Sequence, residues 1–272
     1  MHPVTFRNPF QRTSQATVVA VIPARYASTR FPGKALIDLA GHPMVEHVYR
    51  RAAEARGVDA VVVATDDRRV ADAVEAFGGI ARMTSADHRT GTDRIAEVAR
   101  DLSAGIIVNV QGDEPLVEPL AIAQMVDALA ADPALQMSTL RTTIRREEDY
   151  ASAHVVKVVV DLQDNALYFS RAPIPSHGGP AEAGHYSQSV ASGFSGSAYK
   201  HLGLYAYRRD FLLRLSALPQ TALEQAESLE QLRALEHGFR IRAVETQYDS
   251  IGVDTPEDLE RVRHALMIAT RA

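Results

Sequence analysis

The chain contains no cysteine, which excludes disulfide bridges, thiolate metal sites and a cysteine nucleophile. It has no tryptophan, only 6% aromatic residues and a formal net charge of −5, so it offers nucleic acid neither a basic surface nor a set of stacking rings. No apolar run reaches the roughly 18 residues that a membrane-spanning helix needs. We therefore expect a folded, cytoplasmic protein that binds neither nucleic acid nor membrane.

Two glycine-rich phosphate motifs are also missing. There is no GxGxxG, which argues against a dinucleotide site, and no GxxxxGK[ST], which argues against a P-loop ATPase. The chain nevertheless has 272 residues, of which 46% are hydrophobic and 23% charged. This composition is typical of a globular protein that is long enough to bury a sizeable core.

Short β-branched segments alternate with longer amphipathic ones, which is typical of βαβ units around a mostly parallel sheet. In the first half this pattern predicts strands at 18–23, 60–65, 80–83 and 106–110, and helices at 43–56, 66–77, 92–102 and 119–131. Three strands separated by short polar turns then predict an antiparallel insert or edge, at 137–144, 155–161 and 166–170. The last elements expected are a strand at 201–207, a helix at 223–237, a strand at 240–246 and a helix at 256–268.

The ends and the loops suggest a simple domain organisation. Residues 1–16 are predicted to form a flexible N-terminal arm, and residues 17–272 a single domain. Within that domain, residues 176–199 are rich in Gly, Ser, Pro and His and are predicted to form a variable loop. A loop of that length serves either as a lid or binding loop or is disordered.

The loop after the first predicted strand concentrates positive charge. It carries Arg25, Arg30 and Lys34, together with the hydroxyl groups of Ser28 and Thr29. In open α/β sheets, ligands bind beyond the carboxyl ends of the strands, where loops direct N–H groups and cations at phosphates. This pattern predicts a phosphate site, and a solvated basic loop is the alternative interpretation.

Two aspartates lie just beyond predicted strands, Asp113 after the strand at 106–110 and Asp254 before the last helix. A single aspartate in such a place is more often a turn or helix cap than a ligand. At the second position, however, Thr255 and Asp258 form a capping box that leaves Asp254 without a role. Because Mg²⁺ uses one or two carboxylates when the substrate supplies phosphates, we pair Asp113 with Asp254 as a Mg²⁺ site.

Eight segments in order resemble one known family: IPARYASTRFPGK (22–34), ATDD (64–67), DHRTGTDR (87–94), NVQGDEP (109–115), YFSRAPIP (168–175), HLGLYAYR (201–208), LEQLR (229–233) and GVDTPEDLERVR (252–263). They are similar to those of the 3-deoxy-manno-octulosonate (Kdo) cytidylyltransferases. The resemblance implies an α/β, Rossmann-related, glycosyltransferase-A-like nucleotidyltransferase fold with a mostly parallel central sheet and a smaller antiparallel part for dimerisation and sugar binding. It also implies a Mg²⁺-dependent homodimer that converts CTP and Kdo to CMP-Kdo and diphosphate for lipopolysaccharide biosynthesis.

The resemblance also implies roles for individual residues. The nucleotide-binding set is Ala24, Arg25, Ser28, Arg30, Lys34, Asp87, His88, Gly91 and Gln111. The sugar-binding set is Gln111, Arg171, His201, Tyr205, Glu230 and Gln231. The metal ligands implied are Asp113 and Asp254, and the catalytic set is Lys34, Arg25, Asp113 and Asp254. Since Kdo is an acidic sugar, Arg171 is the expected partner of its carboxylate.

Three other functions stay open on the sequence. A cytidylyltransferase for another acidic sugar, such as 8-amino-Kdo or a sialic acid, would share the nucleotide half and differ in the sugar half. An inactive nucleotide-binding regulator would keep the fold without the chemistry, although the presence of Lys34, Asp113 and Asp254 argues against it. A dinucleotide oxidoreductase would share only the fold class, and the missing glycine motif argues against it.

Overall fold

The computed structural model describes residues 9–10, 17–27, 31–88, 90–176, 198–249 and 251–269. Most of the predicted N-terminal arm and nearly all of the predicted variable loop lie outside the described residues. Ser28 and Arg30, two of the predicted nucleotide ligands, lie outside them as well.

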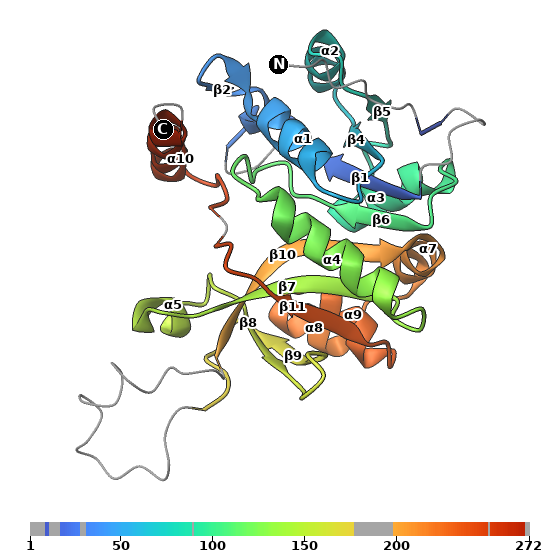
Figure 1. The fold of residues 1–272 in the computed structure, drawn as a ribbon, viewed down its shortest axis with the longest axis vertical. Coiled ribbons are helices and arrows are strands. Elements are labelled where there is room, and N and C mark those ends of the chain that lie inside the picture. The colour runs from blue at the N-terminus through green and yellow to red at the C-terminus, as the bar shows by residue number, and fades with distance from the viewer. Residues whose placement is uncertain are drawn as a thin grey trace.

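The described strands form one nine-stranded mixed sheet and a separate two-stranded one (Figure 1). The order along the large sheet is β11-β7-β10-β6-β1-β4-β5. Four neighbouring strands are parallel: β1 (Val18–Pro23), β4 (Ala60–Thr65), β5 (Ala81–Met83) and β6 (Ile106–Asn109). The predicted α/β fold with a largely parallel central sheet is confirmed. Three of these strands are almost entirely buried, which is why they read as continuous apolar runs.

One long antiparallel strand, β10 (Tyr199–Arg208), continues the sheet beyond β6 and pairs on its other side with β7 (Met137–Thr143). Strand β11 (Ile241–Glu245) then runs parallel to β7. The smaller antiparallel part is the hairpin of β8 (Lys157–Val160) and β9 (Ala166–Ser170), joined to the start of β10.

The prediction that residues 137–144 belong to an antiparallel insert or edge is wrong. Strand β7 lies inside the main sheet, between β10 and β11. Its polar side chains are buried because they bond internally: Ser138 donates to the Met125 carbonyl oxygen at 2.9 Å, and Arg141 donates to the Ala243 carbonyl and to Asp164.

Helices cover both faces of the sheet, and the strand side chains alternate between two cores. Ala20, Ile22 and Val61 face the core shared with α1 (Met44–Glu54) and α4 (Pro119–Ala131). Val19 and Val62 face the core shared with α3 (Gly91–Arg100) and α7 (Arg209–Ala217). The other elements are α2 (Arg68–Ala76), α5 (Glu147–Ala151), α10 (Pro256–Ala269), η1 (Lys34–Leu36), β2 (Asp38–Leu39) and β3 (His42–Pro43).

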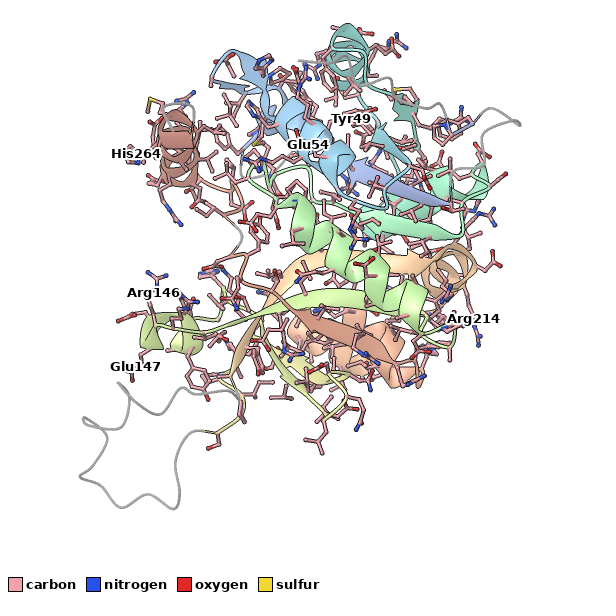
Figure 2. The ribbon with its side chains drawn as sticks, viewed as in Figure 1. Tyr49, Glu54, Arg146, Glu147, Arg214 and His264 are labelled. Carbon is pink, nitrogen blue, oxygen red and sulfur yellow. The ribbon has the colours of Figure 1, made fainter. Side chains whose placement is uncertain are left out.

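Exposed polar side chains mark the surface helices α5 and α10: Arg146 immediately before α5, Glu147 on α5 and His264 on α10 (Figure 2). A small third core of Leu39, Met44, Val253, Leu259, Val262 and Leu266 attaches α10 to the rest of the molecule. Among the described residues, no helix combines the length and apolarity needed to cross a membrane.

The single helix predicted at 223–237 is in fact two short ones, α8 (Ala222–Glu227) and α9 (Gln231–Glu236). The chain breaks at Ser228, whose φ of 54° lies in the left-handed region. Helix α8 is closed at its start by a capping box between Thr221 and Glu224. As a result, Glu230 stands at the start of α9 rather than in mid-helix.

Adjacent arginines at the junction of β10 and α7 bind the ends of two other helices. Arg208 donates to the carbonyl oxygens of Leu129, Asp132 and Leu135 at 2.8, 3.1 and 2.9 Å, where α4 ends. Arg209 donates to the Ala99 and Arg100 carbonyls at 2.8 and 3.0 Å, where α3 ends. These cations add hydrogen bonds to carbonyls at the helix ends, where few backbone N–H groups are available, and complement the negative end of each helix dipole.

Replacing Arg208 by Met should therefore lower the free energy of unfolding by about 2 kcal/mol, because it leaves partly buried carbonyls without a donor. Urea denaturation measures this loss. The matched control is Arg56→Met, since Arg56 forms only a surface ion pair with Asp127 and its side chain is 74% exposed. The control should change the free energy of unfolding by less than about 0.5 kcal/mol. Equal losses in the two variants would contradict the capping role.

Candidate active site

The loops after β1 and β6 lie side by side because these strands are parallel neighbours. An open pocket between them is lined by Pro23, Ala24, Arg25, Lys34, Ala35, Gln111, Gly112 and Asp113. A Cβ atom on Gly112 would stand 2.8 Å from the carbonyl oxygen of Pro23, so only glycine permits this close approach. The structure thus brings together five residues that the sequence singled out: Ala24, Arg25, Lys34, Gln111 and Asp113.

The two predicted metal ligands meet at one ammonium group. Lys34 Nζ donates to Asp113 Oδ2 at 2.6 Å, to Asp254 Oδ1 at 3.2 Å and to the Val253 carbonyl oxygen at 3.2 Å. The Val253 N–H donates to the Asp113 carbonyl oxygen at 2.8 Å, which ties the segment before α10 to the loop after β6. The predicted capping box of Thr255 and Asp258 is present. Both carboxylates therefore converge within reach of a single cation.

Directly beside Asp113, the carboxyl group of Glu114 is buried. Burial and the negative charge of Asp113 raise the pKa of Glu114 to about 8. Tyr248, from the segment after β11, donates its hydroxyl to Glu114 Oε2 at 3.3 Å. This contact is a second tie between the loop of Asp113 and the segment that carries Asp254.

The predicted nucleotide loop at Asp87–Gly91 is attached to the first loop. Arg25 Nη2 donates to the His88 carbonyl oxygen, and the His88 ring bonds to the Glu97 carboxylate. Gly91 is the first residue of α3, whose N-cap is Thr90. The start of α3 therefore lies beside the basic loop that follows β1, at the same edge of the sheet as the pocket.

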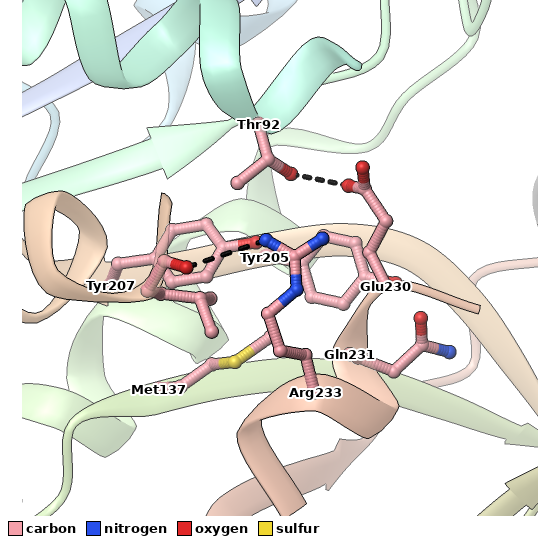
Figure 3. Close-up of a pocket in the computed structure, with 8 residues that line it drawn as sticks. Thr92, Met137, Tyr205, Tyr207, Glu230, Gln231 and Arg233 are labelled. Atoms are coloured by element: carbon pink, nitrogen blue, oxygen red, sulfur yellow. Dashed lines mark hydrogen bonds between the residues drawn. The ribbon is translucent and has the colours of Figure 1, made fainter. Parts of the chain in front are cut away.

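A second pocket lies between β10 and α9 (Figure 3). Its lining is Thr92, Met137, Tyr205, Tyr207, Leu215, Glu230, Gln231 and Arg233, which includes three predicted sugar-binding residues. Thr92 Oγ1 donates to Glu230 Oε2 at 2.6 Å, joining α3 to α9. Among the described residues, Glu230 Oε1 and Gln231 Nε2 are buried without a hydrogen-bond partner. These atoms are an acceptor and a donor that are available to a polar ligand.

A bulge in β10 connects the two pockets. Gln111 Nε2 donates to the Gly203 carbonyl oxygen at 2.9 Å, and the rings of His201 and Tyr205 lie 5.5 Å apart on either side of that residue. Burial lowers the pKa of His201 to about 3, so its ring is neutral at physiological pH. Burial also raises the pKa of Tyr205, which keeps its hydroxyl protonated.

Arg171, the predicted partner of the sugar carboxylate, lines neither pocket. Its Nε donates to the Glu227 carbonyl oxygen at 2.9 Å and its Nη1 to the Ala153 carbonyl oxygen at 3.2 Å. The carbonyl oxygen of Arg171 accepts from the buried Lys157 at 2.6 Å. The structure therefore holds Arg171 beside α8, outside the lining of both pockets.

Comparison with known proteins agrees with this arrangement. Residues 19–242 match the family model described as Cytidylyltransferase. A 3-deoxy-manno-octulosonate cytidylyltransferase of Geobacter sulfurreducens is 59% identical over 249 residues, which are 92% of this chain and 99% of that protein. One of Solibacter usitatus is 51% identical over 245 residues, 90% of this chain and 92% of that protein. The chain belongs to the 3-deoxy-manno-octulosonate cytidylyltransferase family.

The fold of this Kdo cytidylyltransferase family member is similar to those of solved cytidylyltransferase structures. A CMP:2-keto-3-deoxy-manno-octonic acid synthetase complexed with CTP has a TM-score of 0.83 and 47% identity, covering 94% of this chain and 100% of its own. A cytidylyltransferase of Leptospira borgpetersenii is only 16% identical, with a TM-score of 0.59 and coverage of 93% and 87%, and shares the fold. The predicted family, enzyme class and nucleotidyltransferase fold are confirmed.

Several residues that shape this cytidylyltransferase site were not predicted. Thr92, Glu114 and Arg94 lie inside segments that carry the family resemblance, but nothing in their spacing indicates a role. Arg94 is fully buried and donates to Asp66 Oδ2 at 2.7 Å, so it holds the loop after β4 against α3. Tyr248 lies outside those segments, and its partner Glu114 is far away in sequence. Only the fold reveals these contacts.

Replacing Tyr248 by Phe should lower the free energy of unfolding by about 1–3 kcal/mol, because it removes the hydroxyl that donates to the buried Glu114 and keeps the ring. Urea denaturation at neutral pH is the measurement. Tyr26→Phe is the control, since the Tyr26 ring stacks under Arg69 and its hydroxyl bonds to no described residue. If Tyr248→Phe were as stable as the control, the hydrogen bond between Tyr248 and Glu114 would contribute nothing to the free energy of unfolding.

Proposed function

We propose that this protein activates Kdo for lipopolysaccharide biosynthesis by transferring the CMP group of CTP to it. The anomeric hydroxyl oxygen of Kdo attacks the α-phosphorus of CTP, loses its proton, and displaces diphosphate. The observation that carries the proposal is the convergence of Lys34, Asp113 and Asp254 beside the basic loop, in a member of the Kdo cytidylyltransferase family. The relative bound to CTP supports the nucleotide, and the names of the relatives support the sugar.

For the nucleotide, we assign the first pocket and the loops around it. The proposed contacts are Ala24, Arg25, Ser28, Arg30, Lys34, Asp87, His88, Gly91 and Gln111. A cation about 4 Å from a phosphate charge contributes roughly 4 kcal/mol at an effective dielectric constant near 20, before desolvation. Arg25 and Lys34 border the pocket and are placed to offset the charge of a triphosphate. The overall negative charge of the protein is therefore no obstacle.

We propose Asp113 and Asp254 as ligands of Mg²⁺. Their oxygens reach one cation, Lys34 Nζ, and carboxylate oxygen is the donor that Mg²⁺ prefers. Among the described residues, no group of three or more His, Cys, Asp or Glu could enclose a metal, which fits an ion that also binds water and phosphates. When bound, Mg²⁺ supplies charge neutralisation to the reacting phosphate. Lys34 keeps the two carboxylates together by offsetting their mutual repulsion.

For the sugar, we assign the second pocket and the bulge that leads to it. The proposed contacts are Gln111, Arg171, His201, Tyr205, Glu230 and Gln231. The buried Glu230 Oε1 and Gln231 Nε2 support this assignment, because they suit the hydroxyl groups of a sugar. Two donors of Arg171 are engaged by backbone carbonyls, which leaves Nη2 for the carboxylate.

We also propose that the protein is a cytoplasmic homodimer, as the family resemblance implies. The β8–β9 hairpin supports a second copy at this surface, since Leu162 is 99% and Leu167 61% exposed. The absence of cysteine supports a reducing compartment.

Replacing Asp113 or Asp254 by Asn should reduce turnover by at least about a hundredfold, because each change removes a carboxylate charge from the proposed metal site. Diphosphate release from CTP, Kdo and Mg²⁺ is the assay. Asp127→Asn is the control, since Asp127 forms a surface ion pair with Arg56 on the outside of α4. Near-native rates in Asp113→Asn or Asp254→Asn would refute the metal assignment.

The same assay separates the candidate functions. Release that needs both CTP and Kdo supports the proposal, with UTP and sialic acid as negative controls. Release with CTP and a different acidic sugar would keep the mechanism and change the substrate. No release with any sugar, despite CTP binding, would favour an inactive nucleotide-binding protein.

Replacing Arg171 by Ala should raise the KM for Kdo by at least about tenfold and leave the KM for CTP nearly unchanged, because a charge-assisted bond to the carboxylate is lost. Steady-state kinetics with each substrate varied in turn measure the two constants. Arg171→Lys is the companion variant, since it keeps the charge without the planar fork and should fall between. Equal increases in both KM values would contradict the proposal that Arg171 binds the carboxylate of Kdo.

A further inference from the structure

The buried hydroxyl of Thr139 touches three polar atoms at once. Its Oγ1 lies 2.7 Å from the Leu204 carbonyl oxygen, 3.2 Å from the Leu202 carbonyl oxygen and 3.0 Å from Nε2 of His201. Thr139 is fully buried on β7, so water does not compete for these contacts. Only a few placements of the hydrogen atoms can therefore satisfy these buried groups.

The bulge in β10 is what presents the two carbonyls. The pairing of β10 with β7 shifts between Leu202, opposite Leu140, and Tyr205, opposite Thr139. The intervening Gly203 and Leu204 have no partner on β7, so the local carbonyls leave the regular ladder. Thr139 lies directly opposite this irregularity and accommodates it.

The chemistry of the three atoms decides where the hydrogens are. A hydroxyl has one hydrogen to donate and two lone pairs, whereas a carbonyl oxygen only accepts. The Thr139 hydroxyl therefore donates its hydrogen to a carbonyl oxygen of the bulge, and the shorter distance favours that of Leu204. Thr139 Oγ1 can then meet His201 only as an acceptor, so Nε2 of His201 must carry the hydrogen.

A neutral imidazole with its hydrogen on Nε2 has a lone pair on Nδ1. Burial favours the neutral ring, as the depressed pKa of His201 indicates. The ring is held in place by Phe169, edge-on at 4.8 Å, and by Tyr205 at 5.5 Å. No described residue donates a hydrogen bond to Nδ1. Nδ1 of His201 is thus an acceptor in a fixed position, and a hydrogen-bond donor of a ligand can bind to it.

We propose that Thr139 is a positioning residue that holds His201 as the Nε2–H tautomer, so that Nδ1 accepts a hydrogen bond from a hydroxyl of the acidic sugar. The inference rests on the proposed function, because it takes His201 to face the sugar. It extends that function to a residue that does not touch the substrate. It also predicts which kind of group the sugar must offer at this point, a hydrogen-bond donor.

The tautomer can be read directly in the full-length protein. With ¹⁵N-labelled histidine, two-bond ¹H–¹⁵N correlation spectra at neutral pH distinguish a protonated from an unprotonated ring nitrogen. Two histidines serve as internal references, because each bonds a carbonyl oxygen: His47 through Nε2 to Leu39 at 2.7 Å, and His237 through Nδ1 to Arg233 at 2.8 Å. His201 should resemble His47, and addition of Kdo should shift its Nδ1 resonance.

Thr139→Val keeps the branched shape and removes the acceptor, and Thr139→Ser restores the hydroxyl. In the Thr139→Val variant, we expect His201 no longer to be purely the Nε2–H tautomer. The KM for Kdo should rise about fivefold, as the loss of roughly 1 kcal/mol implies, and the KM for CTP should stay unchanged. Ser should restore both readouts. Thr142→Val is the control on the same strand, because Thr142 points to the opposite face of the sheet and its hydroxyl bonds to no described residue.

Three results would overturn the proposal. The first is an Nδ1–H tautomer of His201 in the wild-type protein. The second is the same tautomer of His201 in the wild type and in Thr139→Val. The third is a changed tautomer in Thr139→Val with an unaltered KM for Kdo. Failure of the proposed function looks different, since the wild-type protein would then release no diphosphate from CTP and Kdo while the tautomer spectra kept their values.

Discussion

The site depends on one ammonium group placed between two carboxylates. Asp113 and Asp254 come from distant parts of the chain, and two like charges brought together repel one another. Lys34 Nζ, within hydrogen-bond distance of both, removes that conflict. The backbone bond from Val253 to Asp113 fixes their separation. The two proposed metal ligands are therefore held beside one cation that belongs to the chain itself.

The antiparallel strand β10 gives the molecule its second half. In the sheet it pairs with β6, whose end leads to Gln111, with β7, which carries Thr139, and at its start with β8. The bulge at Gly203 offers one carbonyl to Gln111 and the flanking carbonyls to Thr139. The proposed nucleotide and sugar sides therefore meet at a single irregularity of one strand. A regular strand in the same place would not present these three carbonyls to the two side chains.

The parts of this fold that the sequence predicts are those decided by local patterns. The strands at 18–23 and 60–65 are apolar throughout because both faces of the sheet are covered, and the rule that ligands bind beyond strand ends brought Arg25 and Asp113 together. The parts that were missed depend on distant partners. The polar residues of 137–143 are buried through bonds to other elements, and the break at Ser228 has no glycine or proline to signal it. Residue roles in the sugar pocket came from family resemblance, because a buried glutamate and a surface one look alike in sequence.

In the proposed sugar site, two buried polar atoms without partners among the described residues would bear on which ligand is selected. A buried polar atom without a partner costs about 1–3 kcal/mol, and Glu230 Oε1 and Gln231 Nε2 both stand in that state among the described residues. A ligand with hydroxyl groups at the matching places recovers that free energy, whereas an analogue without them leaves the cost in place. Thr92 binds the other oxygen of Glu230, which favours the present orientation of the carboxylate. Discrimination then follows from rigidity, since a polar group that is held still can be satisfied only by a ligand that brings the right group to it.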